Sequence, residues 1–184
     1  MFARTPRLLL RPGFPEDAPA LAAAIADEAI ARNLATVPWP YRRRDAEAFL
    51  ARPRDPLLPS FLIFERTEAE PRLVGSCGLG RRPSGAVELG YWIVRSHWGR
   101  GIATEACTAL VDIARILGLP SLEGSHFTDN PASARVLDKL GFEPVGIVAP
   151  RLSCARGKEV PARLMRLRLL ADAVVEEAEE AMAA

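Results

Sequence analysis

The chain has 184 residues, of which 49% are hydrophobic and 26% charged, a balance typical of a single globular domain with a full core. The formal net charge of +1 excludes the basic character of many nucleic-acid-binding and membrane-binding proteins, so neither partner is expected. Three widely spaced cysteines without a Cys-x-x-Cys pair are expected to be small buried residues rather than disulfides or zinc ligands, and they favour the reducing cytoplasm.

The N-terminal part is predicted to be one strand followed by helices. Arg7–Arg11 is expected to form the strand, and the apolar run there is too short for a signal peptide or for the roughly 20 residues of a membrane span. Pro15 favours the first turn of a helix, and Asp45 is expected to cap a second, short helix. Between them, Trp39 and Tyr41 stand in a proline-rich segment, where they are expected to pack on the core or to line a pocket.

The middle of the chain changes from strand to helix character. Three segments rich in β-branched, aromatic and leucine residues, joined by short loops, are predicted to pair antiparallel: Ser60–Glu65, Leu73–Leu79 and Val87–Val94. Apolar residues then recur at helical spacing from Ala106 to Leu117, and Gly118 is expected to end that helix.

The remaining chain is predicted to add a strand, a helix and two more strands. Leu122–Phe127 is expected to be a strand, and Asn130-Pro131 a helix cap with a first-turn proline. The last two strands are placed at Phe142–Ala149 and Ala162–Leu169. The loop between them is expected to carry Arg151, Arg156 and Lys158.

These elements predict one α/β domain over residues 1–184, with its core at about 7–170 and an acidic C-terminal helix or tail over 171–184. Its mixed sheet of about seven strands is expected to be antiparallel at the start, parallel around the central helix, and flanked by helices. The pattern contains no repeat or linker that would indicate a second domain.

A glycine-rich turn joins the third antiparallel strand to the central helix, over Trp98-Gly99-Arg100-Gly101-Ile102-Ala103. Glycines let the main chain approach a ligand closely. The first N–H groups of a helix have no partner within the helix, and the helix dipole is positive there. The turn therefore predicts an anion site suited to a pyrophosphate.

Two other phosphate-binding motifs, and a turn that binds nothing, are the alternatives. A Walker A loop requires Gly-Lys-Ser/Thr, whereas Ile102 follows Gly101 here. A dinucleotide fingerprint requires Gly-x-Gly-x-x-Gly, but Thr104 occupies the third glycine position and antiparallel strands precede the loop. That fingerprint would imply a dinucleotide-dependent oxidoreductase.

Three segments together resemble one family. Trp98–Ala103 resembles the Gln/Arg-x-x-Gly-x-Gly/Ala loop of the GNAT acyltransferases, with Trp98 in place of the usual Gln or Arg. Asn130–Ser133 with Leu137–Phe142 is similar to the second signature of the branch that contains ribosomal-protein-alanine N-acetyltransferases. Pro38–Tyr41 is similar to the early Pro-aromatic segment of that branch, and the resemblance covers roughly residues 7 to 170.

The resemblance implies that acetyl-CoA is the co-substrate and that no metal takes part. In this family the pantetheine lies beside the strand before the loop, so main-chain groups of Ile93 and Val94 would pair with it. Asn130 and Ser133 would approach the pantetheine and its sulfur. The pyrophosphate would be held by the loop residues Trp98, Gly99, Arg100, Gly101, Ile102 and Ala103.

Acetyl transfer to an amine needs a base for the amine proton, and an acid can protonate the leaving thiolate. Glu88 is the first candidate for the base, because the family often has an acidic residue at the matching strand position; the alternative is a solvent-facing or ion-paired glutamate. His126 is the second candidate, against a purely structural histidine, and His97 is expected at the surface. Ser133 is the candidate acid or hydrogen-bond donor, because it is the only hydroxyl on a helix where many relatives carry a tyrosine.

The expected function is therefore transfer of an acetyl group from acetyl-CoA to a primary amine, and the branch resemblance favours the α-amine of a protein or peptide. An α-amine has a pKa of about 8, against about 10.4 for lysine, and is easier to deprotonate. A small-molecule amine (amino acid, polyamine or antibiotic) and a non-catalytic CoA-binding module are the alternatives. The acceptor pocket of this monomer or homodimer is expected to involve Trp39, Tyr41, Tyr91 and His126.

Overall fold

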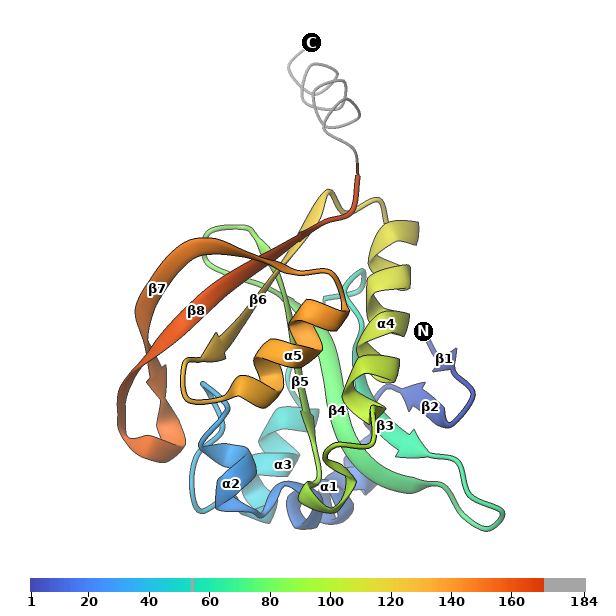
Figure 1. Ribbon diagram of the computed structural model, residues 1–184. Helices are drawn as coiled ribbons and strands as arrows, with labels where there is room; N and C mark the ends of the chain where they lie inside the picture. Colours follow the sequence, from blue (N-terminus) through green and yellow to red (C-terminus); the bar gives the residue numbers. More distant parts are fainter. Residues whose placement is uncertain (54, 171–184) are drawn as a thin grey trace.

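The computed structural model describes residues 1–53 and 55–170, and the predicted acidic segment over 171–184 lies outside them. The described residues form one eight-stranded sheet in the order β1-β2-β3-β4-β5-β6-β8-β7 (Figure 1). The strands are β1 (Ala3–Arg4), β2 (Leu8–Arg11), β3 (Ser60–Glu65), β4 (Arg72–Arg81), β5 (Val87–Ile93), β6 (Ser121–Phe127), β7 (Glu143–Ser153) and β8 (Lys158–Arg168). The mixed sheet is thus confirmed, with one strand more than expected because Ala3 and Arg4 pair with the far end of β2.

The described helices are few and mostly short. They are the 3₁₀ turns η1 (Pro15–Asp17), η2 (Arg95–His97) and η3 (Cys154–Arg156), and the α-helices α1 (Ala18–Ile25), α2 (Glu28–Ala31), α3 (Arg43–Leu50), α4 (Ile102–Ile116) and α5 (Pro131–Lys139). Asp45 does not cap α3 as expected. It lies in the first turn, and its carboxylate accepts a hydrogen bond from the N–H of Arg42 at 2.7 Å.

The helices cover both faces of the sheet. Alternate residues of a strand point to opposite faces, and β3 follows this rule: Phe61 and Ile63 belong to the core under α4, whereas Leu62 and Phe64 pack with α1 and α3. The same alternation in β5 directs Val87, Leu89, Tyr91 and Ile93 toward the α4 core.

The parallel pair β5 and β6 separates soon after it forms. Glu88 and Glu123 are the single pair of partners in register between the described parts of these strands. The other neighbouring strands pair antiparallel, mostly over several residues. Beyond Glu88 the two strands diverge, and α5 lies across the region between them (Figure 1). On the side that faces β6, the end of β5 near Ile93 therefore has no partner strand among the described residues, although β4 pairs with it on the other side.

The C-terminal hairpin is longer than the sequence pattern indicates. Arg151 lies within β7 and Lys158 begins β8, so of the three basic residues expected in the loop only Arg156 is in the connecting turn. Pro150 and Pro161 face each other in the ladder. Prolines usually interrupt a strand pattern, which made both strands look shorter than they are.

Candidate active site

The turn before α4 has the geometry of an anion site. Gly99 and Gly101 have φ of +72° and +75°, a backbone conformation that only glycine adopts easily. The first hydrogen bond of α4 runs from the N–H of Glu105 to the carbonyl of Gly101 at 3.0 Å. Within the described chain, the N–H groups from Gly99 to Thr104 have no acceptor. These donors converge at the positive end of a 15-residue helix, which is where a pyrophosphate would bind.

At the end of β5, beside this turn, the N–H of Ile93 is the main-chain group that is open to pantetheine. The N–H of Val94 donates to the carbonyl of Val74 at 2.9 Å, and the carbonyl of Val94 accepts from the N–H of His97 at 2.9 Å. Both main-chain polar groups of Val94 therefore already have a partner within the chain, and its pairing with pantetheine stays a prediction. Because hydrogen bonding alternates along an antiparallel pair, Ile93 turns its N–H away from β4 toward the gap. Its carbonyl accepts the indole N–H of Trp98 at 2.7 Å, which folds the turn back onto the strand.

His97 is buried, not exposed as expected, and it connects the turn to the end of β3. Its Nε2 lies 3.1 Å from a carboxylate oxygen of Glu65 in β3, and its Nδ1 lies 2.9 Å from the hydroxyl of Ser96. The other oxygen of Glu65 accepts from Arg100 at 3.2 Å. These contacts are structural, because they link the turn to β3 on the side away from α5.

A cleft of about 660 Å³ opens beside the diverging strands. It brings together five predicted site residues: Tyr41, Glu88, Tyr91, His126 and Ser133. It does not include Trp39, whose side chain is at the surface with 38% exposure, so the expected role of Trp39 in the pocket is not supported.

Glu88 enters the cleft from β5, on the opposite face from Val87 and Leu89, as the alternation predicts. Its carboxylate is heavily engaged: one oxygen accepts from Ser125 at 2.9 Å and from Arg151, and the other accepts from Arg151 at 2.9 Å and Arg82 at 3.2 Å. Burial opposes ionisation, but the hydrogen bonds and charges of the two arginines outweigh it and lower the pKa of Glu88. The ion-paired alternative for Glu88 is therefore realised.

The partners of Glu88 were missed by sequence reasoning. Arg151 lies 63 positions away in β7, and Ser125, which also contacts Arg151, lies 37 positions away in β6. Arg82 joins Glu88 to Glu123, and Arg166 pairs with Glu123 from β8. Arg82 is local, six positions before Glu88, but Ser125, Arg151 and Arg166 reach the two glutamates only through the strand order β5-β6-β8-β7.

His126 is buried in β6, and one of its ring nitrogens is free. Its Nδ1 lies 2.9 Å from the carbonyl of Phe127. A carbonyl only accepts, so this contact fixes the proton on Nδ1 and leaves a lone pair on Nε2 in the neutral ring. Nε2 has no hydrogen-bond partner within the described chain. Every fully buried side-chain nitrogen in that part of the chain does have a partner, so Nε2 is not fully buried and reaches solvent at the cleft.

Tyr91 and Ser133 meet at the cleft from β5 and α5. The two hydroxyls lie 2.9 Å apart, and burial raises the pKa of Tyr91, so its hydroxyl stays protonated. Asn130 caps α5 as expected, and its side-chain oxygen accepts from the N–H of Ser133 at 3.2 Å. The sequence placed no tyrosine on this helix, yet the fold supplies one from the neighbouring strand.

Other expectations can be compared with the described chain. Cys77 and Cys107 are buried, whereas Cys154 is exposed in the turn η3, contrary to the expectation that all three are buried. In the described residues we find no group of three or more His, Cys, Asp or Glu side chains placed to hold a metal ion. None of the described helices is both long and apolar enough to cross a membrane.

Comparison with known proteins agrees with this geometry. Residues 7–143 match the family model of the acetyltransferase (GNAT) domain. The chain is 33% identical over 79 residues to the uncharacterized N-acetyltransferase p20 of Bacillus licheniformis, and 38% identical over 85 residues to the probable N-acetyltransferase YjcK of Bacillus subtilis (strain 168). These alignments cover 41% and 44% of this chain, and 44% and 47% of the respective relatives.

A solved structure shows the same fold. It is that of RimL, described as a ribosomal L7/L12 alpha-N-protein acetyltransferase in complex with coenzyme A, with a TM-score of 0.75 and 18% identity. The likeness covers 94% of this chain and 100% of that one. The matched family domain spans most of the chain, and the chain therefore belongs to the GNAT acetyltransferase family.

Proposed function

We propose that the protein is an N-acetyltransferase that moves the acetyl group of acetyl-CoA to a primary amine. The observation that carries the proposal is the row of N–H groups from Gly99 to Thr104 that have no acceptor among the described residues. This row lies beside a gap in the sheet that opens onto the cleft. Family membership supports the activity, and the RimL structure described with coenzyme A supports the co-substrate.

The residues present fit acetyl-CoA, which supplies the acetyl group as a thioester. The N–H groups of the Gly99–Ala103 turn suit its pyrophosphate, and the N–H of Ile93 suits the pantetheine amide. Asn130 acts on acetyl-CoA through Ser133 in this scheme, because its side-chain oxygen accepts from the N–H of Ser133 and fixes that residue at the start of α5. The hydroxyls of Tyr91 and Ser133 are the donors available to the thiolate sulfur as negative charge develops on it.

The contacts favour His126 over Glu88 as the base. A carboxylate that holds two arginines and a hydroxyl, and whose pKa is lowered, attracts a proton weakly. His126 presents a free Nε2 lone pair at the cleft, and no cation is paired with that nitrogen in the described chain. We therefore assign proton removal from the amine to Nε2 of His126, and to Glu88 the placement of Arg151.

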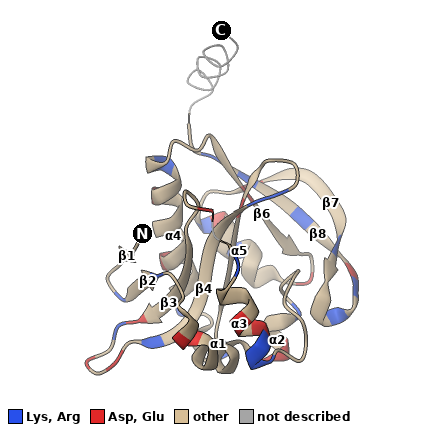
Figure 2. Cartoon of the chain, turned by 180° about the vertical axis from the view of Figure 1, so that it is seen from behind, with Lys and Arg blue, Asp and Glu red and all other residues tan. Residues whose placement is uncertain are grey.

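The acceptor we favour is the α-amine of a protein or peptide, as RimL is described to use. Its pKa, near 8, lies below the value of about 10.4 for a lysine side chain, so the α-amine is easier to deprotonate. Along the chain in Figure 2, basic and acidic residues are interspersed over many elements, and the formal net charge is +1. We accordingly expect a cytoplasmic monomer or homodimer whose partner is the amine rather than nucleic acid or membrane.

The test is release of CoA thiol from acetyl-CoA in the presence of an amine panel. N-terminal peptides should give kcat/KM at least tenfold above lysine, polyamines and aminoglycosides. Higher activity with a small amine would overturn the acceptor assignment and leave the activity standing. CoA binding without turnover on any amine would favour a non-catalytic binding module.

A further inference from the structure

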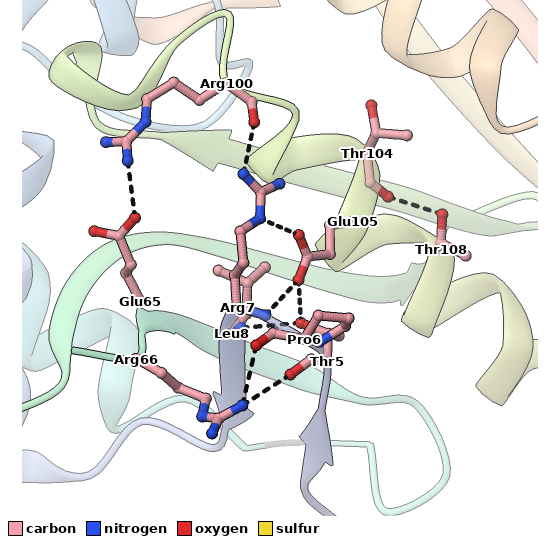
Figure 3. Close-up of polar contacts among 10 residues, drawn as sticks. All are labelled: Thr5, Pro6, Arg7, Leu8, Glu65, Arg66, Arg100, Thr104, Glu105 and Thr108. Atoms are coloured by element: carbon pink, nitrogen blue, oxygen red, sulfur yellow. Dashed lines mark hydrogen bonds and ion pairs between the residues drawn. The ribbon is translucent and has the colours of Figure 1, made fainter. Parts of the chain in front are cut away.

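The N-terminal segment docks on the proposed pyrophosphate turn. Thr5, Pro6 and Arg7 connect β1 to β2 and lie against the start of α4 (Figure 3). Arg66, the residue after β3, in turn holds this segment by donating to the carbonyls of Pro6 at 3.1 Å and Thr5 at 3.4 Å. The segment is thus fixed where the anion site is, almost 100 positions along the chain from it.

The N-terminal segment is attached to α4 through Glu105, whose negative charge is unfavourable beside a site for phosphate. It lies in the first turn of α4, beside the N–H groups proposed to bind phosphate. Its carboxylate accepts from the hydroxyl of Thr5 at 2.5 Å, from the N–H of Arg7 at 2.9 Å and from Nε of Arg7 at 2.7 Å. Without these donors, its negative charge would repel a bound pyrophosphate.

Arg7 also contacts the turn itself. Its Nη1 donates to the carbonyl of Arg100 at 3.0 Å, which holds the main chain between the two glycines (Figure 3). Its Nη2 has no partner within the described chain and lies 3.6 Å from where a β-carbon on Gly101 would be. The guanidinium therefore stands at the turn with Nη2 still without an acceptor in the described chain, and 46% of the side chain is exposed.

We propose that Arg7 is a positioning residue for the CoA phosphates. It fixes the Arg100 carbonyl so that the turn keeps its N–H groups outward, and it neutralises Glu105 where phosphate charge arrives. This inference rests on the proposed function and adds to it a residue outside the family loop.

The test compares Arg7→Ala with Arg115→Ala, which removes an exposed, ion-paired arginine at the other end of α4. By calorimetry, Arg7→Ala should weaken CoA binding about tenfold, as expected for one charge-assisted hydrogen bond, whereas Arg115→Ala should bind like the unaltered chain. With acetyl-CoA the KM of Arg7→Ala should rise while kcat stays within about twofold. S-acetylpantetheine, which lacks the phosphates, should show no change between the variants.

Two further variants separate the parts of the proposal. Glu105→Gln added to Arg7→Ala should recover part of the lost CoA affinity, because the unneutralised carboxylate is removed; no recovery would overturn the neutralising role. Arg7→Lys keeps the charge but lacks the planar fork that reaches Glu105 and the Arg100 carbonyl together, so its CoA affinity should lie in between. It replaces Arg7→Ala if that variant does not fold.

The outcomes also distinguish this inference from the proposed function. If the unaltered chain binds no CoA, the proposed function fails. If it binds CoA and Arg7→Ala binds it equally well, or if Arg7→Ala loses activity with acetyl-CoA and S-acetylpantetheine alike, only the role of Arg7 is wrong.

Discussion

Arg151 in β7 grips the carboxylate of Glu88 in β5 with two nitrogens, and its Nη2 lies 2.9 Å from Oε2. Both side chains are mostly buried, with 29% and 18% exposure, and both line the cleft. This ion pair argues against Glu88 as the catalytic base, because a carboxylate that orients a guanidinium is a poor acceptor for a substrate proton.

Glu88→Gln should therefore act mainly through Arg151. The amide cannot neutralise the guanidinium, so we expect the free energy of unfolding to fall by about 1–3 kcal/mol. Turnover should fall by about tenfold or less, with the shape of the pH–rate profile preserved. A loss of about 10²–10³ that recovers at high pH would instead restore Glu88 as the base.

His126→Gln should have the larger effect on turnover. Glutamine can keep a hydrogen bond to the carbonyl of Phe127 but has no basic nitrogen, so kcat should fall about 10²–10⁴-fold. A kcat close to that of the unaltered chain would contradict the assignment.

Gly101→Asp should abolish CoA binding. The residue has φ of +75°, which a side chain tolerates poorly, and the new carboxylate would stand among the N–H groups proposed to hold the pyrophosphate. Gly118→Asp is a matched control, because Gly118 has φ of +69° but lies at the far end of α4. Calorimetry should show CoA binding in the control only; equal binding in both would falsify the placement of the pyrophosphate.

Local signals predicted much of this protein, and long-range contacts account for what was missed. The turn around Gly101 and the cap at Asn130 depend on neighbouring residues, so their chemistry is legible in the sequence. His97 was misplaced because its burial depends on Glu65, 32 positions away. The hydroxyl of Tyr91 reaches Ser133 across 42 positions, and only the packing of α5 against the gap brings them together.

The free energy of unfolding should depend on pH through Asp17 in η1, which pairs with Arg11 in β2. The hydrogen bond from Arg11 is the largest of the influences that lower the pKa of Asp17, whose carboxylate lies 2.8 Å from both terminal nitrogens of Arg11. Because the folded pKa lies below the unfolded value of about 3.9, this stabilisation is complete above that pH and is lost as pH falls through the folded pKa. Asp17→Asn should thus lower the free energy of unfolding by about 1–3 kcal/mol at pH 7. In denaturant titrations the difference from the unaltered chain should shrink below about pH 4; a difference that stays constant to pH 2 would rule out this linkage.

Tyr91→Phe and Ser133→Ala should reveal which hydroxyl serves the leaving thiolate. Tyr91 is the stronger candidate on chemical grounds, since a phenol is more acidic than an aliphatic hydroxyl. Burial raises the pKa of Tyr91, so its proton is retained throughout the neutral range, but it also makes that proton harder to give up fully.

We therefore expect hydrogen bonding to the sulfur rather than complete proton transfer. A thiol such as that of CoA has a pKa near 8.5 and leaves tolerably well unaided. Losing one donor should reduce kcat roughly ten- to thirtyfold, the equivalent of about 1–2 kcal/mol. Because the two hydroxyls are 2.9 Å apart and share one hydrogen bond, the effects should not add, and the double variant should be little worse than the more damaged single one. CoA affinity should be nearly unchanged in all three. If Ser133→Ala turns over at full speed while Tyr91→Phe does not, Tyr91 is the donor and packing alone holds it in place without Ser133. If both variants run at full speed, the thiolate leaves without help from this pair.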